Sequence, residues 1–208
     1  MLRLSRLNYC GRVPQGQDSP VDSVLLDATA AAIARWGLEA TTLDRIAQEA
    51  GMSRATVYRR RVSRDQLVSA LTARAAETFR VALWPALTSP GRAADRLRAA
   101  LEATCQVADD YLDLLAGLYL AHGEVFHKPG PDALTVDVFA EPYERLLLDG
   151  AIDGSLRDVP ATVTATVLFN MLGWGYVHLR ASHHWDADRA KKAVIDLVLM
   201  GLITAPHS

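Results

Sequence analysis

The spacing of small and apolar residues between positions 42 and 61 constrains the fold of this chain more than any other feature. Ala47 follows Leu43 by four positions, and Gly51 follows Ala47 by four more. A small side chain fits where two helices cross closely, and glycine adopts a positive φ in a turn at low cost. Four further residues supply apolar contacts between the two helices: Ile46, Ala50, Met52 and Val57. The pattern predicts a helix-turn-helix, although an ordinary helical hairpin uses similar residues.

Arginine is concentrated in and just after the second helix of this pattern. Residues 51–64 hold five arginines and no acidic residue. Up to residue 64 the chain has ten basic and six acidic residues (+4), whereas the remainder has twelve basic and eighteen acidic residues (−6). Judged by charge alone, the arginines are explained equally well by a solvent-exposed charged helix face and by a nucleic-acid-binding surface. Together with the spacing, the charge favours DNA binding over the hairpin alternative.

The rest of the chain is predicted to be helical. Ala, Leu, Arg, Asp and Glu dominate, and alternating β-branched runs are absent. Helix starts are expected at Ser19 with Pro20, at Thr41 or Thr42, at Ser53 and at Ser63. Helices are predicted near residues 19–36, 42–50, 53–60, 63–84, 91–108, 110–127, 132–150, 160–183 and 187–203. The helix from 63 is expected to end at Leu83 or Trp84, because Pro85 follows.

Length and composition fit a globular protein of one or two domains. The chain has 208 residues, of which 50% are apolar and 22% are charged, with a net charge of −2. This composition excludes an intrinsically disordered chain. No window of ~18 uninterrupted apolar residues predicts a membrane-spanning helix, so no membrane partner is expected.

A family resemblance rests on residues spread from position 26 to position 67. They are Leu26-Asp27-Ala28, Gly37, Ala40-Thr41-Thr42, Ile46-Ala47, Ala50-Gly51-Met52-Ser53, Thr56-Val57-Tyr58 and Ser63-Arg64 with Leu67. At these positions the chain resembles the DNA-binding domain of TetR/AcrR-type one-component transcriptional regulators. The resemblance implies an all-α chain with an N-terminal three-helix helix-turn-helix domain, followed by a larger helical ligand-binding and dimerisation domain. The expected division is a flexible arm at 1–18, the DNA-binding domain at 19–63 and the effector domain at 64–208.

One dipeptide departs from the family pattern. The family usually has His-Phe two and three positions after the tyrosine, where this chain has Arg60-Arg61. The phenylalanine normally packs the recognition helix against the next helix. Its absence leaves that contact to Val57, Val62 and Leu67, and adds two charges beside the presumed DNA face.

The recognition helix of such a domain enters the major groove with its N-terminal part. Arg54 is the best candidate to read a base, because its fork matches the two acceptors of guanine; Ala55 suits a thymine methyl, and Arg59 is a further candidate. Six residues are suited to phosphates: Thr42, Ser53, Thr56, Tyr58, Arg60 and Arg64. Tyr58 also fits a packing role, and the resemblance favours the phosphate. The arginines of residues 1–18 suit a minor groove, but a loose terminal segment is the favoured interpretation.

Aromatic residues of the larger domain are candidates to line a ligand cavity, although each one alone is more simply explained as core. A buried polar side chain among these aromatic residues needs a hydrogen-bond partner. A ligand is one possible partner, but a neighbouring side chain or a water molecule is the commoner one. The candidate ligand-binding residues are Trp84, Tyr111, Leu115, Tyr119, His122, Phe126, Phe139, Tyr143, Phe169, Asn170 and Trp174.

The last two predicted helices are apolar on more than one face, which indicates deep burial or a partner. Gly173 and Gly201 lower helix propensity there, and close packing explains them. The resemblance implies that this pair of helices forms a four-helix bundle across a two-fold axis, so that a homodimer meets two half-sites of a palindrome. The candidate interface residues are Leu172, Gly173, Tyr176, Val194, Leu197, Val198, Gly201 and Leu202.

No catalytic or metal-binding pattern stands out. A nucleophile with a paired base, a phosphate loop and a dinucleotide fingerprint are all absent from the sequence. His122 and His127 are five apart, about 140° out of register on a helix. The chain is therefore predicted to be no enzyme and to need no cofactor or metal. Two cysteines (Cys10 and Cys105) and no secretion signal indicate the reducing cytoplasm.

The expected function is that of a ligand-responsive repressor. A homodimer would bind a palindromic operator in double-stranded DNA, and a small, mostly apolar effector would release it. An activator of the same fold is one alternative, because the sign of regulation depends on where the operator lies. A helical small-molecule carrier or enzyme is the other; it would bind ligand tightly and retard no DNA.

Overall fold

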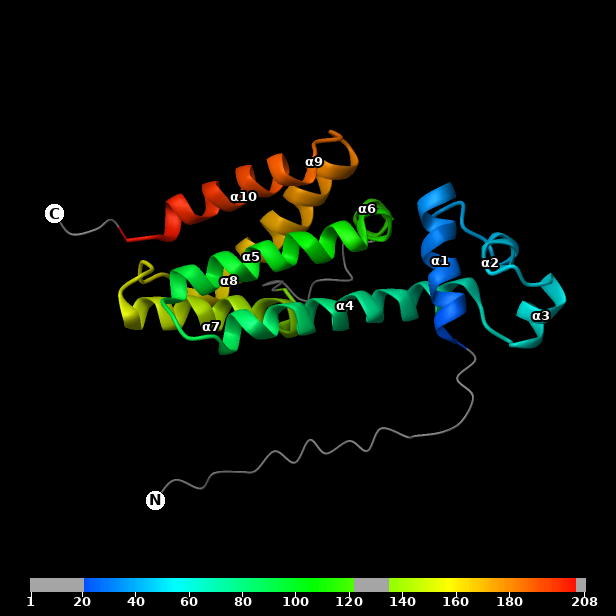
Figure 1. The fold of residues 1–208 in the computed structure, drawn as a ribbon, viewed down its shortest axis with the longest axis horizontal. Helices are drawn as coiled ribbons and strands as arrows, with labels where there is room; N and C mark the ends of the chain where they lie inside the picture. Colours follow the sequence, from blue (N-terminus) through cyan, green and yellow to red (C-terminus); the bar gives the residue numbers. More distant parts are fainter. Residues whose placement is uncertain (1–20, 122–134, 205–208) are drawn as a thin grey trace, which may run out of the picture.

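The computed structural model describes residues 21–121 and 135–204 (Figure 1). In these two ranges the regular elements are helices joined by loops and turns, and Leu156 and Ile203 form an isolated β-bridge. The elements are α1 (Ser23–Trp36), α2 (Leu43–Glu49), α3 (Arg54–Arg59), α4 (Arg64–Thr88), α5 (Ala93–Asp110), α6 (Leu112–Ala121), α7 (Asp137–Asp153), α8 (Ala161–Asn170), the π-helical turn η2 (Met171–Tyr176), α9 (Val177–Ala181) and α10 (Ala187–Leu202). The predicted all-α class is confirmed. No helix within the described ranges is long and apolar enough to cross a membrane.

Side chains cap the helices of the N-terminal region. The side-chain oxygens of Asp22, Thr42 and Ser53 each accept the backbone N–H three residues on, at 2.9, 3.3 and 3.1 Å. Ser63 and Gln66 form a reciprocal capping box at the start of α4. Each cap satisfies a backbone donor that has no partner inside its helix. The caps predicted at Thr42, Ser53 and Ser63 are confirmed.

Two helix boundaries differ from the prediction. Helix α1 begins after Asp22, and Ser19, expected as its cap, lies outside the described residues. Helix α4 runs to Thr88, so its predicted end before Pro85 is wrong. A proline removes one helical hydrogen bond. Here it stands in the last turn, and Ala86 beside it is buried, so packing offsets the loss.

The segment predicted as one helix at 160–183 contains a π-helical turn. Helix α8 passes directly into η2, and η2 passes into α9. A π turn holds one more residue than an α turn, so the side chains after it face a different direction. Of the two helices predicted at 110–127 and 132–150, the structure describes α6 and α7, and residues 122–134 between them lie outside the described ranges.

Buried apolar side chains form two clusters. The smaller lies among α1, α2, α3 and the start of α4, and consists of Leu25, Ala28, Ala32, Ile46, Ala47, Val57, Val62 and Leu67. The larger extends through α4 to α10. The expected contact among Val57, Val62 and Leu67, in place of the missing phenylalanine, is therefore present. Because α4 contributes to both clusters, the domain boundary at residue 64 stays a prediction.

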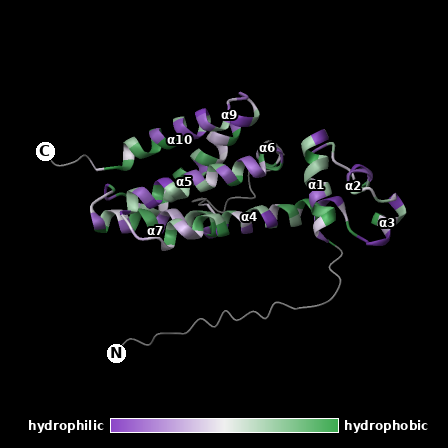
Figure 2. Ribbon diagram, in the orientation of Figure 1, coloured by the Kyte–Doolittle hydropathy of each residue, from purple (hydrophilic) through white to green (hydrophobic). Residues whose placement is uncertain are grey.

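Long helix α4 connects the small helices to the larger bundle (Figure 1). Helix α1 packs on α2 and α4, and α6 packs against α1. The approach of α6 is close: a Cβ on Gly117 would lie 2.5 Å from Cβ of Leu38. Figure 2 shows hydrophilic and hydrophobic residues on opposite sides of several helices, as expected for helices that bury one face.

Candidate functional sites

Helix α3 turns one side toward the small core and the other toward solvent. Val57 is fully buried, whereas Arg54, Ala55, Tyr58 and Arg59 are exposed. Positions i, i+1, i+4 and i+5 share one face of a helix. The fold therefore brings four of the candidate DNA-binding residues onto one exposed surface, which we call the α3 face. Gly51, in the turn before it, has φ 63°, the positive value that the turn was predicted to need.

Arg54 is held only loosely by the protein. Its Nη1 lies 3.2 Å from Oδ2 of Asp44, and its side chain is 73% exposed. Exposed ion pairs of this kind contribute about 0–1 kcal/mol. The guanidinium is thus available to another partner at small cost.

Arg59 and Arg61 have no carboxylate partner among the described residues, and both are exposed. Arg61 lies two residues after the end of α3 and has a φ of 55°, an uncommon value for a residue with a side chain. It was not among the candidate residues. The run of three arginines at 59–61 was the signal, but the sequence does not show which of them points outward.

Arg60 points inward and pairs with Asp22, the residue that caps α1. The backbone N–H of Leu25 and the Arg60 guanidinium together hold the pKa of the Asp22 carboxyl below its usual value. The pair ties the end of α3 to the start of α1, 38 positions away in the chain. The contact engages Arg60 within the protein, so its predicted phosphate role has less support than that of Arg59.

Arg64 clamps the loop between α1 and α2. Its Nε donates to the carbonyl of Thr41 at 2.9 Å and its Nη2 to the carbonyl of Leu38 at 2.6 Å, while Nη1 lies 2.8 Å from Asp65. All three guanidinium nitrogens are therefore engaged, and the geometry favours a positioning role for Arg64 over the predicted phosphate contact.

The remaining candidates of this site are small hydroxyl residues at helix starts. Thr42 and Ser53 are exposed caps, and Thr56 is half-buried with its hydroxyl 2.8 Å from that of Ser53. Their positions beside the α3 face are compatible with phosphate contacts, which stay a prediction.

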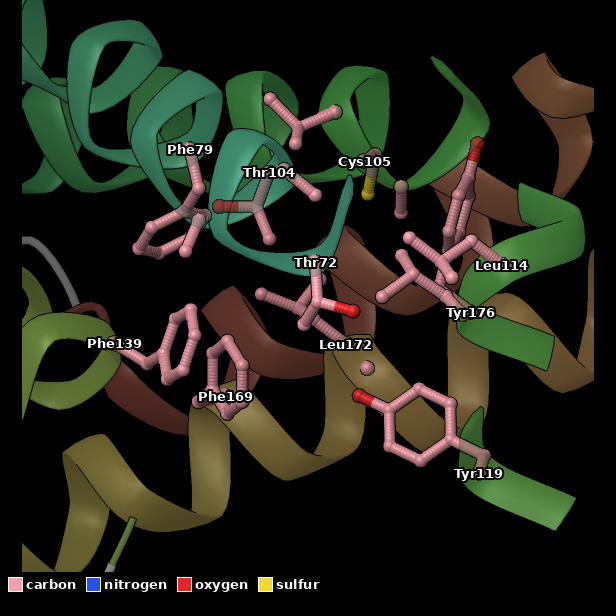
Figure 3. A pocket seen from close by; sticks show the side chains of 16 residues that line it. Thr72, Phe79, Thr104, Cys105, Leu114, Tyr119, Phe139, Phe169, Leu172 and Tyr176 are labelled. Carbon is pink, nitrogen blue, oxygen red and sulfur yellow. The ribbon is translucent and has the colours of Figure 1, made fainter. Parts of the chain in front are cut away.

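A cavity of about 60 Å³ lies inside the larger cluster (Figure 3). Helices α4, α5, α6, α7 and α8 and the turn η2 contribute to its wall. Four candidate ligand residues line it: Leu115, Tyr119, Phe139 and Phe169. The sequence did not single out Thr72, Phe79, Thr104 or Cys105, which also line it. They are ordinary core residue types, and only the fold places them around a void.

Three phenylalanine rings meet at one end of the cavity. The centroid of Phe79 lies 5.6 Å from that of Phe139 and 6.0 Å from that of Phe169, with edge-to-face geometry in both pairs. The rings of Phe139 and Phe169 stack at 4.9 Å. Such pairs are favourable beyond their burial. They give the cavity a rigid aromatic end.

Several candidate ligand residues do not line this cavity. Trp84 is 61% exposed on α4. Trp174 is exposed as well, and its ring lies 4.4 Å from that of Tyr119. The position of a tryptophan in an apolar stretch did not predict that it lines the cavity, because a helix presents residues to both the core and the solvent. His122 and Phe126 lie outside the described residues.

Three other candidates have partners within the protein. The hydroxyls of Tyr111 and Tyr143 pair with threonine hydroxyls at 3.1 and 2.5 Å. The amide of Asn170 donates to the carbonyl of Thr166 at 2.8 Å. None of the three lines the cavity. The commoner explanation of a buried polar group, a neighbouring side chain or backbone group, therefore holds for them.

Cys105 is the residue of the cavity wall with the most reactive chemistry, and burial raises its pKa to about 12. The thiol is therefore protonated at neutral pH, and the thiolate is the reactive form. In a Cys10→Ser variant we expect iodoacetamide at pH 8 to alkylate native Cys105 at least ~100-fold more slowly than the denatured chain. Mass spectrometry over time measures both rates. Equal rates would show that the thiol is not shielded.

The described residues contain no group of three or more His, Cys, Asp or Glu side chains that could hold a metal ion. His122 and His127, considered above, lie outside the described ranges.

Most candidate interface residues face the interior of their own chain. Leu172 and Tyr176 are buried and line the cavity together with Gly173. Val194, Val198 and Leu202 are buried in the larger cluster, whereas Leu197 and Gly201 are exposed. A helix that is apolar on several faces buries one of them internally, and the pattern alone does not show which. For the five buried residues, the interface assignment loses its support.

A different set of apolar side chains is exposed on the same helices. We call it the apolar stripe. Its members are Val163, Val167, Met171, Trp174, Leu197, Met200 and Ile203. Val163, Val167 and Met171 are spaced by four residues along α8 and into η2, which places them on one side of that run, and Trp174 follows within η2. The last three lie on or just after α10, and η2 packs against α10.

Residues 25–71 match the sequence model of bacterial regulatory proteins of the tetR family. No curated protein matches the sequence. Solved structures with a similar fold include PfmR of Thermus thermophilus, a TetR family transcriptional regulator (TM-score 0.67, 21% identity, 86% of this chain and 98% of that one). Another is SmeT, the repressor of the Stenotrophomonas maltophilia multidrug efflux pump SmeDEF (0.66, 21%, 87% and 89%). A third is the ketosteroid transcriptional regulator KstR2 of Mycobacterium tuberculosis (0.65, 19%, 87% and 94%).

A helix-turn-helix with an exposed basic face, joined to a larger helical bundle, defines a DNA-binding transcriptional regulator. Residues 25–71 match the tetR-family model, and the fold of the whole chain is similar to that of TetR/AcrR-type transcriptional regulators.

Proposed function

We propose that the protein is a homodimeric repressor that binds a palindromic operator and leaves it when a small, mostly apolar effector occupies the cavity. The observation that carries the proposal is the α3 face, where Arg54 and Arg59 project from a helix-turn-helix that is locked from behind by Val57. SmeT, which has a similar fold, is a repressor, and this likeness supports repression over activation. Binding to chromosomal DNA would place the protein in the cytoplasm.

The apolar stripe supports the homodimer. Exposed apolar patches of this kind mark contact surfaces, and a two-fold axis brings the same patch of two copies together. A dimer formed in this way would present two α3 faces to two half-sites of a palindrome.

Helix α6 offers a route from the cavity to the DNA-binding helices. It carries Leu114, Leu115 and Tyr119 of the cavity wall, and its Gly117 lies directly against Leu38 at the end of α1. The cavity is small beside ligand pockets of about 300–1,000 Å³. An effector must therefore widen it, and movement of α6 is transmitted to α1 because no space separates them.

The coupling has a thermodynamic test. An effector that favours one arrangement changes DNA affinity by about 5–150-fold, and operator DNA must weaken effector binding by the same factor. Calorimetric titration of the effector with and without operator measures this factor. Equal effector affinity in both titrations would contradict release by effector.

DNA binding is tested by selecting bound sequences from a random pool of DNA duplexes. We expect a palindromic site, and an affinity that falls steeply with salt: neutralising about four to eight phosphates per dimer gives a log–log slope of several negative units. A flat salt response, or no selected sequence, would contradict the proposal. Placing the selected site downstream or upstream of a reporter promoter then distinguishes repressor from activator.

Arg54→Ala should weaken operator binding by about 1–3 kcal/mol and relax the preference at one base pair per half-site, because a bidentate contact to guanine is lost. Binding to operators altered at each position measures both effects. Arg35→Ala is the matched control: Arg35 is also exposed and ion-paired, at 3.2 Å from Glu49, but lies on α1 away from the α3 face. A uniform loss of affinity over all sequences would show that Arg54 contacts phosphate instead.

A further inference from the structure

The wall of the cavity is uncharged. Sixteen described residues line it, and none of them is Asp, Glu, Lys, Arg or His (Figure 3). An ion that enters such a space exchanges its hydration shell for apolar contacts, at a large cost in free energy. Among the described residues, no opposite charge on the wall offsets that cost.

Three hydroxyls on the wall use their protons within the protein. Thr72 and Thr104 donate to the backbone carbonyls four residues before them, at 2.9 and 2.8 Å. The hydroxyl of Tyr176 donates to Oδ2 of Asp109 at 2.6 Å, outside the cavity wall. The hydroxyl of Tyr176 thus faces away from the cavity, and the oxygen of Thr104 also lies 2.5 Å from the hydroxyl of Tyr143. What the Thr72 oxygen offers toward a ligand is lone pairs, so it accepts a hydrogen bond and does not donate one.

The pKa values of the titratable groups on the wall are shifted in the direction expected for an apolar environment. Burial is the first cause that raises the pKa of Cys105, Tyr119 and Tyr176 above their ordinary values. For Tyr176 the carboxylate of Asp109 raises the pKa further. Negative charge is therefore disfavoured at several points around the cavity.

The rigid aromatic end of the cavity favours aromatic ligands, whereas the uncharged wall disfavours ionised ones. The rings of Phe79, Phe139 and Phe169 line one end of the cavity and pack against one another edge to face and face to face (Figure 3). A flat aromatic ligand gains ring contacts there that a flexible chain does not make.

We propose that the effector is a neutral aromatic molecule whose polar group donates a hydrogen bond, such as a phenol, and that ionised carboxylic acids and phosphates are excluded. This inference rests on the proposed function of the cavity as the effector site. It restricts the class of effector that the cavity accepts. Ligands of similar size and apolar area are distinguished by their charge and by whether their polar group donates or accepts the hydrogen bond.

Three probes with one ring system test the proposal on the unaltered full-length protein: 2-naphthol, 2-methoxynaphthalene and 2-naphthoate. Isothermal titration at pH 7 measures each affinity. We expect 2-naphthol to bind best, the methyl ether more weakly, and the carboxylate on the order of 100-fold more weakly than the naphthol. Naphthoate binding equal to or tighter than naphthol binding would overturn the proposal, and so would failure of all three probes to bind.

Two glycines of η2 provide a matched pair that tests where the probe binds. A Cβ on Gly173 would overlap the hydroxyl of Tyr119, so that ring must move, whereas a Cβ on Gly175 meets nothing within 4 Å. Gly173→Ala should weaken 2-naphthol binding at least ~10-fold, and Gly175→Ala should leave it unchanged. Circular dichroism checks that both variants keep their helices. Unchanged or tighter binding by Gly173→Ala would overturn the assignment to this cavity.

A DNA retardation assay on the same protein separates this inference from the proposed function. Selective binding of 2-naphthol by a protein that retards no DNA would support the ligand class and overturn the repressor. Operator binding by a protein that prefers 2-naphthoate would support the repressor and overturn the ligand class.

Discussion

Arg64→Ala is expected to lower the free energy of unfolding by about 2 kcal/mol in the absence of DNA, because two charge-assisted hydrogen bonds to backbone carbonyls are lost. These bonds join the start of α4 to the carbonyls of Leu38 and Thr41 in the loop between α1 and α2. The loop sets the position of α2 relative to α1. Operator affinity should therefore fall together with stability. Chemical denaturation followed by tryptophan fluorescence measures the first effect.

Arg59→Ala and Arg61→Ala are the matched controls, because both arginines are exposed and lack a carboxylate partner among the described residues. Each should change stability by less than ~0.5 kcal/mol. Each should still weaken binding to all sequences and reduce the salt slope by about one unit if it contacts a phosphate. An Arg64→Ala protein of full stability that binds all DNA weakly would show that Arg64 contacts phosphate after all.

The double substitution Leu197→Glu and Met200→Glu is expected to convert a dimer of about twice the 22.6 kDa chain mass into monomers. Both side chains are exposed members of the apolar stripe, with Met200 at 78%. Burying four unpaired carboxylates across a two-fold interface costs several kcal/mol for each ion. Operator affinity should fall on the order of 100-fold or more, since one α3 face then reads one half-site. Light scattering after size exclusion measures the mass.

Ile152→Glu controls for the charge alone. Ile152 is 86% exposed on α7 and does not belong to the apolar stripe. This variant should remain dimeric and keep its operator affinity. A doubly substituted protein that stays dimeric would place the interface elsewhere on the molecule.

Features set by neighbouring residues were predictable from the sequence. The caps at Thr42, Ser53 and Ser63 join groups three residues apart. The small core holds Ala47 and Val57 at the predicted spacing, and Gly51 forms the turn between them. Such contacts lie within one or two helical turns, so the order of residue types is sufficient to define them. Fold class and the helix-turn-helix followed from this local information.

The roles of individual arginines did not follow from local information. Arg60 meets Asp22 across 38 positions, and Arg64 meets Leu38 across 26. In the sequence both belong to a basic run next to the recognition helix, where a phosphate contact is the natural expectation. Only the packing of α3 and α4 against α1 and its loop turns these two side chains inward and leaves Arg59 and Arg61 outside.

The sequence by itself determined that the chain is helical, where its helix-turn-helix lies and that its last helices carry surplus apolar surface. The tertiary structure decided which of those apolar residues enclose a cavity and which remain exposed. The π-helical turn η2 illustrates the difference: it turns Leu172 and Tyr176 inward and leaves Met171 and Trp174 exposed. All four are apolar or aromatic, so composition does not separate them. Their directions depend on how α8 and η2 pack against the rest of the bundle, and those contacts come from residues far away in the chain.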